Sequence, residues 1–267
     1  MVSYKSTIFE TKAVVIRHMP LGEADRLVTF FSEEFGKVRA IARGVRRYKS
    51  KMSGHLDILN LVTISVGKGK GIDVITEVDT LNDHSKIKKD LKSISIAVYL
   101  AELVESVSME ESPNEKLFSM FVSTLTILPD LDEYTSVLRY FEIKLLEYSG
   151  FGPELNHCLE CFKVLPPADH YFSTDNGGLI CFDCGRSFEG SKFSIKKNTI
   201  KLFRYFQNNS ERDSLALIVP EIYSSELEYI LNQYIKHVVG KEMKSTKFLD
   251  LISNKVQESK VDDMEST

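Results

Sequence analysis

The four cysteines of this 267-residue chain form two close pairs. Cys158, Cys161, Cys181 and Cys184 follow the spacing C-x2-C-x19-C-x2-C. Each CxxC turn can direct two thiolates at one ion, and two such turns complete a tetrahedron with Zn–S distances of about 2.3 Å. The pattern predicts one structural Zn²⁺, because a shell of four thiolates leaves no position open for a catalytic water. A redox-active pair and cysteines without metal are the alternatives.

A second stretch with chemical potential is the basic segment KVRAIARGVRRYKSK at residues 37–51, which has seven cations and no acid. Alternation around Val38 and Ala40 predicts a strand with an apolar inner face and a basic outer face, which Gly44 ends before a loop. An anionic nucleic-acid backbone would relieve the repulsion among these cations, and a base could stack on the tyrosine. The candidate nucleic-acid-binding residues are Lys37, Arg39, Arg43, Arg46, Arg47, Tyr48, Lys49 and Lys51. The alternative is a solvated edge strand that discourages aggregation.

Other chemical motifs are weak, and no catalytic residue is assigned. The sequence GKGKG at 67–71 lacks the spacing and the Ser/Thr of a phosphate-binding P-loop. Acidic pairs such as Glu110 and Glu111 are adjacent, so their side chains diverge on a strand or a helix. Two smaller basic groups are more typical of solvated faces, although either could extend a nucleic-acid path. They are Lys196, Lys197, Lys201 and Arg204, and Lys236, Lys241, Lys244 and Lys247.

Charge is distributed unevenly along the chain. The formal net charge is −4, but residues 1–72 contain 13 basic and 6 acidic residues, a net +7. The remaining residues contain 21 basic and 32 acidic residues, a net −11. A basic N-terminal part can therefore face phosphate while the acidic remainder stays away from it.

The elements that must position the basic segment are short strands. Apolar alternation predicts strands at 12–18, 26–32, 37–43, 56–66 and 72–79, with a hairpin turn at 67–71. Five short strands in about 75 residues favour a small closed barrel of the oligonucleotide-binding (OB) type. An SH3-like barrel fits the number of strands almost as well.

Helical periodicity begins at Ser85 and continues to the cysteine pairs. Helices are predicted from residue 85 to about 107, at 115–128 and at 133–149. After the cysteines, helices are predicted at 195–207 and 224–239, the second with a capping box at 225–228, and a last turn is predicted at 246–252. The fold class is therefore α+β and multidomain: an OB-type barrel, then a helical bundle with an inserted zinc ribbon-like module. We expect domains at 1–80 and 81–252, the module at about 151–190, and a disordered tail at 253–267.

The chain has no apolar run suited to a signal peptide or a membrane span. We expect a cytoplasmic protein without a membrane partner. Cysteine usage agrees, because in a reducing compartment paired CxxC turns favour metal over disulfides.

Three segments resemble the bacterial recombination mediators of the RecO family. They are AVVIRHMPLGEADRLVTFFSEEFGKVRAIARGVRRYKSK, YFEIKLLEYSGFGPELNHCLECF and YFSTDNGGLICFDCG. The first contains a G-E-x-D-R turn and a G-K-x-x-x-x-A-R-G-x-R-R segment, and the other two are similar to the family's zinc module. The likeness extends from about residue 8 to residue 252.

The resemblance implies a non-enzymatic DNA repair protein associated with the nucleoid. Such a protein binds single- and double-stranded DNA through its N-terminal barrel and anneals complementary strands. Together with RecR, it helps RecA load onto DNA covered by single-strand-binding protein, whose acidic C-terminal tail it contacts. The DNA-binding role falls on the basic segment 37–51, and the zinc ligands are the four cysteines.

Two other functions compete with this one. One is a protein–protein adaptor whose basic barrel docks acidic tails without binding DNA. The other is an enzyme acting on nucleic acid, such as a nuclease, against which the lack of a carboxylate cluster or an open metal site argues. Salt-dependent DNA binding in the absence of any partner would distinguish the DNA-binding mediator from the adaptor.

Overall fold

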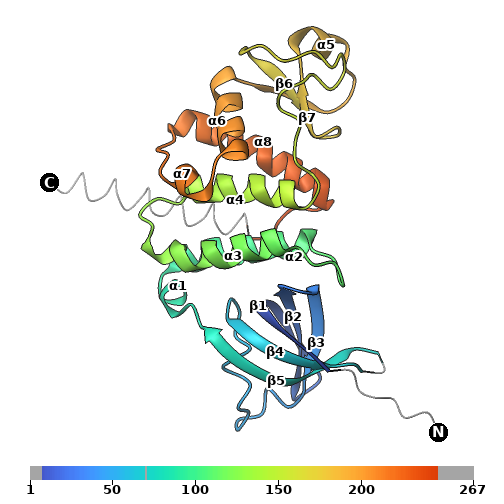
Figure 1. Cartoon of the computed structure of the whole chain (residues 1–267), viewed down its shortest axis with the longest axis vertical. Coiled ribbons are helices and arrows are strands. Elements are labelled where there is room, and N and C mark those ends of the chain that lie inside the picture. Colours follow the sequence, from blue (N-terminus) through green and yellow to red (C-terminus); the bar gives the residue numbers. More distant parts are fainter. Residues whose placement is uncertain (1–7, 70, 246–267) are drawn as a thin grey trace, which may run out of the picture. The chain divides into compact units, whose positions relative to one another are not determined.

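The computed structural model describes residues 8–69 and 71–245, and Figure 1 shows the path of the chain. The described residues up to Asp130, together with Met243–Ser245, belong to one compact unit, and Leu131–Glu242 form a second. The domain limits expected at residues 80 and 252 remain a prediction. The expected last turn at 246–252 and the tail at 253–267 lie outside the described residues.

The first unit begins with a closed barrel in the order β1-β2-β3-β5-β4. Its strands are β1 (Ile8–Leu21), β2 (Asp25–Ser32), β3 (Gly36–Ala42), β4 (Leu61–Gly67) and β5 (Asp73–Asn82). Neighbouring strands are antiparallel except β3 and β5, which run parallel. The predicted five-stranded OB-type barrel is thereby confirmed. Inward residues such as Val28, Phe30 and Ile64 are buried and form its core.

The fourth strand is shorter than the pattern predicts. We expected it over 56–66, but β4 begins at Leu61. Leu59 has φ +69°, so the backbone turns there instead of extending. Leu56 and Leu59 are nevertheless fully buried. The apolar spacing marked buried side chains correctly, but a loop supplies the first of them to the core.

Three helices follow the barrel within the same unit. They are α1 (Ser85–Lys89), α2 (Leu91–Val107) and α3 (Glu115–Ile127), with a 3-10 turn η1 (Leu128–Asp130) after them. The single helix predicted from residue 85 is interrupted at Asp90, which has extended backbone and accepts a hydrogen bond from the Ser93 N–H at 2.7 Å. That carboxylate caps a new helix, which explains the break.

The second unit contains α4 (Thr135–Tyr148), α6 (Lys197–Asn208), α7 (Glu211–Leu215) and α8 (Glu221–Val239). Helix α4 packs against the other three. Helix α7 was not predicted. The capping box expected at 225–228 is wrong as a helix start, because α8 already begins at Glu221, directly after Pro220. Proline at that boundary supplies helix-compatible φ without needing a hydrogen-bond acceptor.

The cysteine module lies between α4 and α6. It contains a three-stranded sheet in the order β7-β6-β8 and a short helix, α5. The strands are β6 (His170–Ser173), β7 (Gly178–Ile180) and β8 (Lys192–Ile195), and the helix spans Phe182–Ser187. Two cysteines precede the sheet and two lie at the start of α5. The expected α+β architecture with an inserted module is confirmed.

Candidate nucleic-acid interface and metal centre

The loop after β3, residues 43–60, is irregular but firmly attached to the barrel. Gly44 has φ +65° and donates its N–H to Asp25 Oδ1 at 2.7 Å. The Arg46 N–H donates to the Ala24 carbonyl at 2.9 Å. Val45 and Leu56 are buried in the barrel core. These anchors fix the loop at both ends, so the charged side chains between them lie outside.

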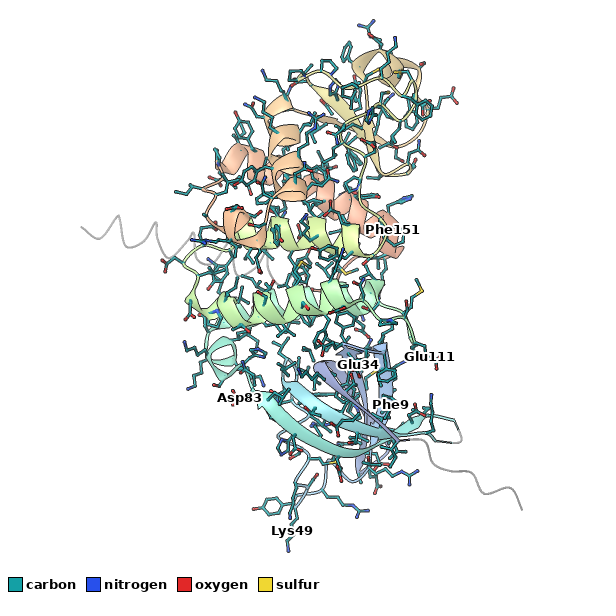
Figure 2. The ribbon with its side chains drawn as sticks, viewed as in Figure 1. Phe9, Glu34, Lys49, Asp83, Glu111 and Phe151 are labelled. Carbon is teal, nitrogen blue, oxygen red and sulfur yellow. The ribbon has the colours of Figure 1, made fainter. Side chains whose placement is uncertain are left out.

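The cations of this loop face solvent. Tyr48 is as exposed as in an extended chain, with a relative accessibility of 102%. Among the described residues, no carboxylate forms an ion pair with any loop cation, namely Arg43, Arg46, Arg47, Lys49 and Lys51. We call this set, with Tyr48, the basic loop. Lys49 lies at one tip of the barrel in Figure 2, well away from Phe9, Glu34 and Glu111.

The two cations on β3 have a different environment. The Lys37 ammonium donates to the Glu105 carbonyl at 3.0 Å. The Arg39 guanidinium donates to Glu110 Oε1 at 2.5 Å through Nε. Both acceptors lie at the end of α2 or in the connection after it. The strand and loop were predicted to form one basic surface, but the structure divides it into two groups.

The outer face of β2 and β3 is partly covered by the chain itself. Phe31 on β2 is fully buried, with its ring centroid 5.9 Å from that of Phe118 on α3. The Lys37 N–H donates to the Met109 carbonyl at 3.0 Å. OB barrels commonly bind oligonucleotides on this face. The adjacent pair Phe30-Phe31, apolar on both faces of one strand, was the sequence signal for this cover.

The four cysteines converge on one point. Their Sγ atoms all lie within 4.8 Å of one another, and those of Cys161 and Cys181 are 4.0 Å apart. A tetrahedron with Zn–S distances of about 2.3 Å has S–S edges of about 3.8 Å. The cluster therefore fits a tetrahedral metal ion, as the spacing predicted. His157 and His170 lie outside it: His157 faces Glu154, and His170 Nε2 lies 2.9 Å from the Pro166 carbonyl oxygen.

The protein favours the thiolate at Cys158 and the thiol at Cys184. Burial alone would raise the pKa of Cys158, but hydrogen bonds from the N–H groups of Cys161, Cys181 and Glu160 outweigh it and lower the pKa to about 6. Hydrogen bonding with the Cys181 sulfur is the main reason why the pKa of Cys184 is raised to about 12. One sulfur is thus ionised easily while another retains its proton. A bound cation would replace that proton and stabilise all four thiolates.

The residues that follow the two CxxC turns are constrained in different ways. Gly185, after the second turn, has an ordinary helical φ, and a Cβ there would collide with the Tyr171 ring. Phe162, at the equivalent position of the first turn, has φ +60° and is 77% exposed. The first turn therefore adopts the left-handed conformation without a glycine, at some cost in strain.

The smaller basic groups are partly engaged in structural contacts. Lys196 pairs with Asp169 at 3.1 Å, and the Arg204 guanidinium donates to the Leu155 carbonyl. Lys236 pairs with Glu242 at 2.7 Å. Lys197 and Lys201 are exposed on α6. Lys247 lies outside the described residues.

Comparison with protein families covers nearly the whole chain. Residues 6–84 match the family Recombination protein O N terminal, and residues 88–247 match Recombination protein O C terminal. The chain belongs to the RecO family. The boundary between the two RecO regions, at 84–88, falls where β5 ends and α1 begins.

Curated relatives support the same assignment. A protein named DNA repair protein RecO from Dehalococcoides mccartyi (strain ATCC BAA-2266 / KCTC 15142 / 195) is 36% identical over 245 residues, covering 92% of this chain and 96% of the relative. The protein of that name from Roseiflexus sp. is 31% identical and covers 92% of this chain and 86% of its own length. The one from Alkaliphilus metalliredigens is 33% identical, with coverages of 85% and 92%. Within the described residues of this RecO chain, no helix is long and apolar enough to cross a membrane.

Proposed function

We propose that this RecO family protein is a DNA repair and recombination mediator that binds single- and double-stranded DNA and anneals complementary strands. With RecR, it helps RecA load onto DNA coated by single-strand-binding protein, and it contacts the C-terminal tail of that protein. It performs these steps in the cytoplasm, at the nucleoid, without making or breaking a covalent bond. Membership of a family of DNA repair proteins supports the proposal.

The basic loop is the observation that carries this function. It presents five cations and one exposed aromatic ring on a rigid barrel, and its cations have no acidic partner in the part of the chain that the structure describes. A phosphate backbone can therefore bind without first displacing a carboxylate. Since phosphate contacts do not depend on sequence, the loop binds any strand.

Annealing follows from charge neutralisation. Two complementary strands repel each other until cations reduce the charge between them. Weak contacts then let the strands slide into register, while a base can stack on Tyr48 without sequence preference. Lys37 and Arg39 have a lesser role in this scheme, because their side chains are already bonded to the Glu105 carbonyl and to Glu110.

The four-cysteine cluster holds one structural Zn²⁺ in this proposal. Thiolate ligands in a tetrahedral set favour zinc in a reducing compartment. When bound, the ion supplies only cross-linking, because four sulfurs occupy its shell. The cysteine turns before β6 and at the start of α5 become joined through it.

The test is the affinity for an unstructured oligonucleotide such as poly-dT, measured against salt. Contacts with about five phosphates give a slope of log affinity against log salt near −3.5 for single strands. We choose Arg47→Glu/Lys49→Glu, because these side chains make no hydrogen bond or ion pair with other described residues, whereas the Arg46 guanidinium donates to the Gly22 carbonyl. Losing two cations should make the slope shallower by about 1.4 and weaken binding.

The matched control is Lys197→Glu/Lys201→Glu, which changes the same charge on the exposed face of α6. It should bind DNA almost as well as the wild type. If both double variants weaken binding equally, net charge and not the basic loop governs affinity. If the wild type binds DNA only weakly while binding an acidic peptide, the adaptor function replaces this proposal.

A further inference from the structure

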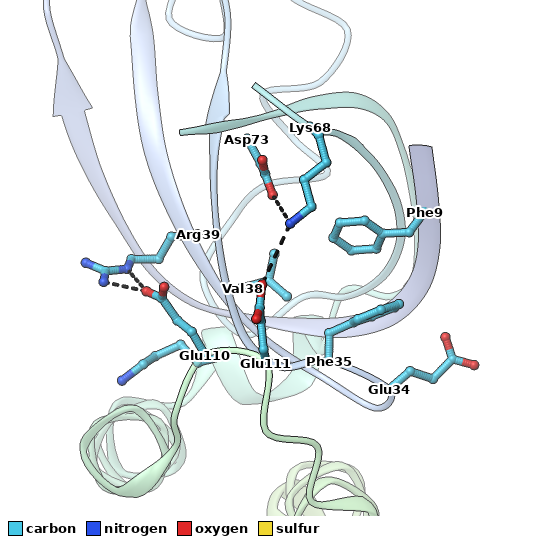
Figure 3. Close-up of a pocket in the computed structure, with 10 residues that line it drawn as sticks. Phe9, Glu34, Phe35, Val38, Arg39, Lys68, Asp73, Glu110 and Glu111 are labelled. Atoms are coloured by element: carbon cyan, nitrogen blue, oxygen red, sulfur yellow. Dashed lines mark hydrogen bonds and ion pairs between the residues drawn. The ribbon is translucent and has the colours of Figure 1, made fainter. Parts of the chain in front are cut away.

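The end of the barrel opposite the basic loop has an opening near the start of β3. Strands β3 and β5 pair through only two residue pairs, Ala40 with Asp73 and Ile41 with Val74. The first half of β3 therefore has no β5 neighbour. A pocket of about 320 Å³ lies there, lined by residues of β1, β3 and β5 and of the loops beside them (Figure 3). This is the size range of pockets that bind small groups.

The interior of the pocket is apolar and aromatic. The rings of Phe9 and Phe35 have centroids 4.4 Å apart and an interplanar angle of 44°. Both are only partly buried and pack against the barrel core, and Val38 lies beside them in the lining. Since these rings rest on the core, they form a firm surface that an additional apolar side chain could cover.

The rim of the pocket is acidic. Glu34, Asp73, Glu110 and Glu111 line it, against Lys37, Arg39 and Lys68. Two of the cations have acidic partners: Arg39 pairs with Glu110, and Lys68 lies 3.7 Å from Asp73 and 3.8 Å from Glu111. The third, Lys37, donates to the Glu105 carbonyl and keeps its charge. Glu34 is exposed and has no ion pair among the described residues, and Glu111 is 85% exposed. Figure 3 shows Glu34 and Glu111 on opposite sides of Phe35.

This combination does not suit nucleic acid. A base could stack on the two rings, but its phosphates would meet the carboxylate of Glu34, unpaired among the described residues, and a rim on which four acids face three cations. A peptide cation gains from those same carboxylates. The pocket therefore differs in kind from the basic loop at the other end of the barrel.

We propose that this pocket is a docking site for a partner protein, in which an aromatic or large aliphatic side chain flanked by Lys or Arg enters the opening. The apolar side chain covers Phe9 and Phe35. One flanking cation binds the unpaired Glu34, and the other binds the exposed Glu111 in competition with its 3.8 Å pair to Lys68. The inference goes beyond DNA binding and does not rest on it. It adds a protein contact that leaves the basic loop accessible to DNA.

The probe is a short peptide, acetyl-Lys-Trp-Lys-amide, titrated against the full chain. The protein contains no tryptophan, so the fluorescence of the peptide reports binding without background. The comparison peptide, acetyl-Glu-Trp-Glu-amide, has the same ring and opposite charge. Since the basic peptide can form two exposed ion pairs at the rim, it should bind about tenfold more tightly than the acidic peptide, a difference of about 1.4 kcal/mol.

Variant Glu34→Lys/Glu111→Lys should remove or reverse that preference. Glu111 has φ +56°, and lysine experiences about the same strain as glutamate in this left-handed conformation, so the substitution should not disturb the backbone. The matched control Glu23→Lys/Glu77→Lys changes the same charge at exposed positions outside the pocket and should keep the preference. Circular dichroism confirms that each variant folds.

Three results would overturn the proposal. The first is equal affinity of the wild type for the two peptides. The second is equal loss of preference in the pocket and control variants. The third is displacement of the peptide by poly-dT in the Arg47→Glu/Lys49→Glu background, which would assign the pocket to nucleic acid instead.

Discussion

The basic loop and the cysteine turns are both irregular segments that hold charged groups in place, but they are stabilised by different means. The loop after β3 is held by Val45 and Leu56 in a closed apolar core and by the bond from Gly44 to Asp25. The cysteine turns adjoin strands of three or four residues, and three of the four cysteines are partly exposed. Within the turns at 158–162 and 181–184 only Cys158 is buried, so the turns need another source of order, which the thiolates can obtain from a metal ion.

The largest expected effect comes from removing that ion. Structural zinc contributes on the order of 10 kcal/mol in small zinc domains, so Cys181→Ser or a strong chelator should unfold the module. The barrel should remain folded, since its core contains no cysteine. Amide hydrogen exchange followed by mass spectrometry would show rapid exchange at 151–190 and unchanged protection in β1 to β5. Unchanged protection and metal content in Cys181→Ser would refute the claim that the cysteine turns depend on a metal ion.

The converse change serves as its control. Leu56→Ala removes a fully buried anchor of the basic loop and should cost about 2–5 kcal/mol of barrel stability. The metal content should not change. If both variants unfolded the whole chain together, the two regions would not be independent.

A smaller effect should come from pH, through His84. Its Nδ1 is 2.7 Å from the Leu59 carbonyl, near the end of the loop after β3, so the imidazole is another anchor of that loop. Burial lowers its pKa below the ordinary 6.5 and outweighs the hydrogen bond with the Leu59 carbonyl, which raises it; nearby Lys88 also lowers the pKa, and Asp83 raises it. Because charging is disfavoured in the fold, this stability is fully present above about pH 6.5 and is lost as the pH falls through the lower folded pKa.

The contribution of His84 to barrel stability can be measured by urea unfolding of the metal-loaded protein between pH 7.5 and pH 5. Barrel resonances in NMR would report the unfolding. His84→Asn suits the left-handed backbone at this position (φ +47°) and removes the titration. The variant should be less stable at pH 7.5 and less dependent on pH. An identical pH dependence in the two proteins would show that His84 does not contribute it.

The smallest effect concerns Phe162. Its φ of +60° costs roughly 1 kcal/mol in a residue other than glycine, and its exposed ring contributes little packing. Phe162→Gly should therefore stabilise the metal-bound module by about that amount, less the entropy that glycine loses on folding. Competition with a chromophoric chelator would detect tighter metal binding. Weaker binding would indicate that the Phe162 ring makes a contribution that its exposure does not suggest.

The local sequence pattern was sufficient to predict much of the structure. Alternation predicted five strands and the inward and outward sides of β3, and cysteine spacing predicted the convergent cluster. What it missed depends on contacts between distant residues. Asp90 interrupts a helical pattern because its carboxylate caps α2, and Leu59 turns where apolar residues suggested a strand.

The candidate site shows the same limit. The residue types of the basic segment were correct, but the partners of Lys37 and Arg39 lie about 70 positions away, at Glu105 and Glu110. No local pattern could reveal that these cations are engaged. The acidic pocket was missed for the same reason, because Phe9, Phe35 and Glu111 come from three separate segments.

The contact at Gly36 restricts how the gene could be divided. Its φ is +65°, and a Cβ there would collide with the Ser112 carbonyl, so this strand start and the connection between α2 and α3 fit only together. A fragment that ended near residue 84 would expose Phe31 and leave the Lys37 N–H without the Met109 carbonyl. Such a fragment would tend to aggregate, because it would present an aromatic side chain beside an unpaired strand. Recombination between genes would therefore transfer this barrel intact only if the first helices moved with it.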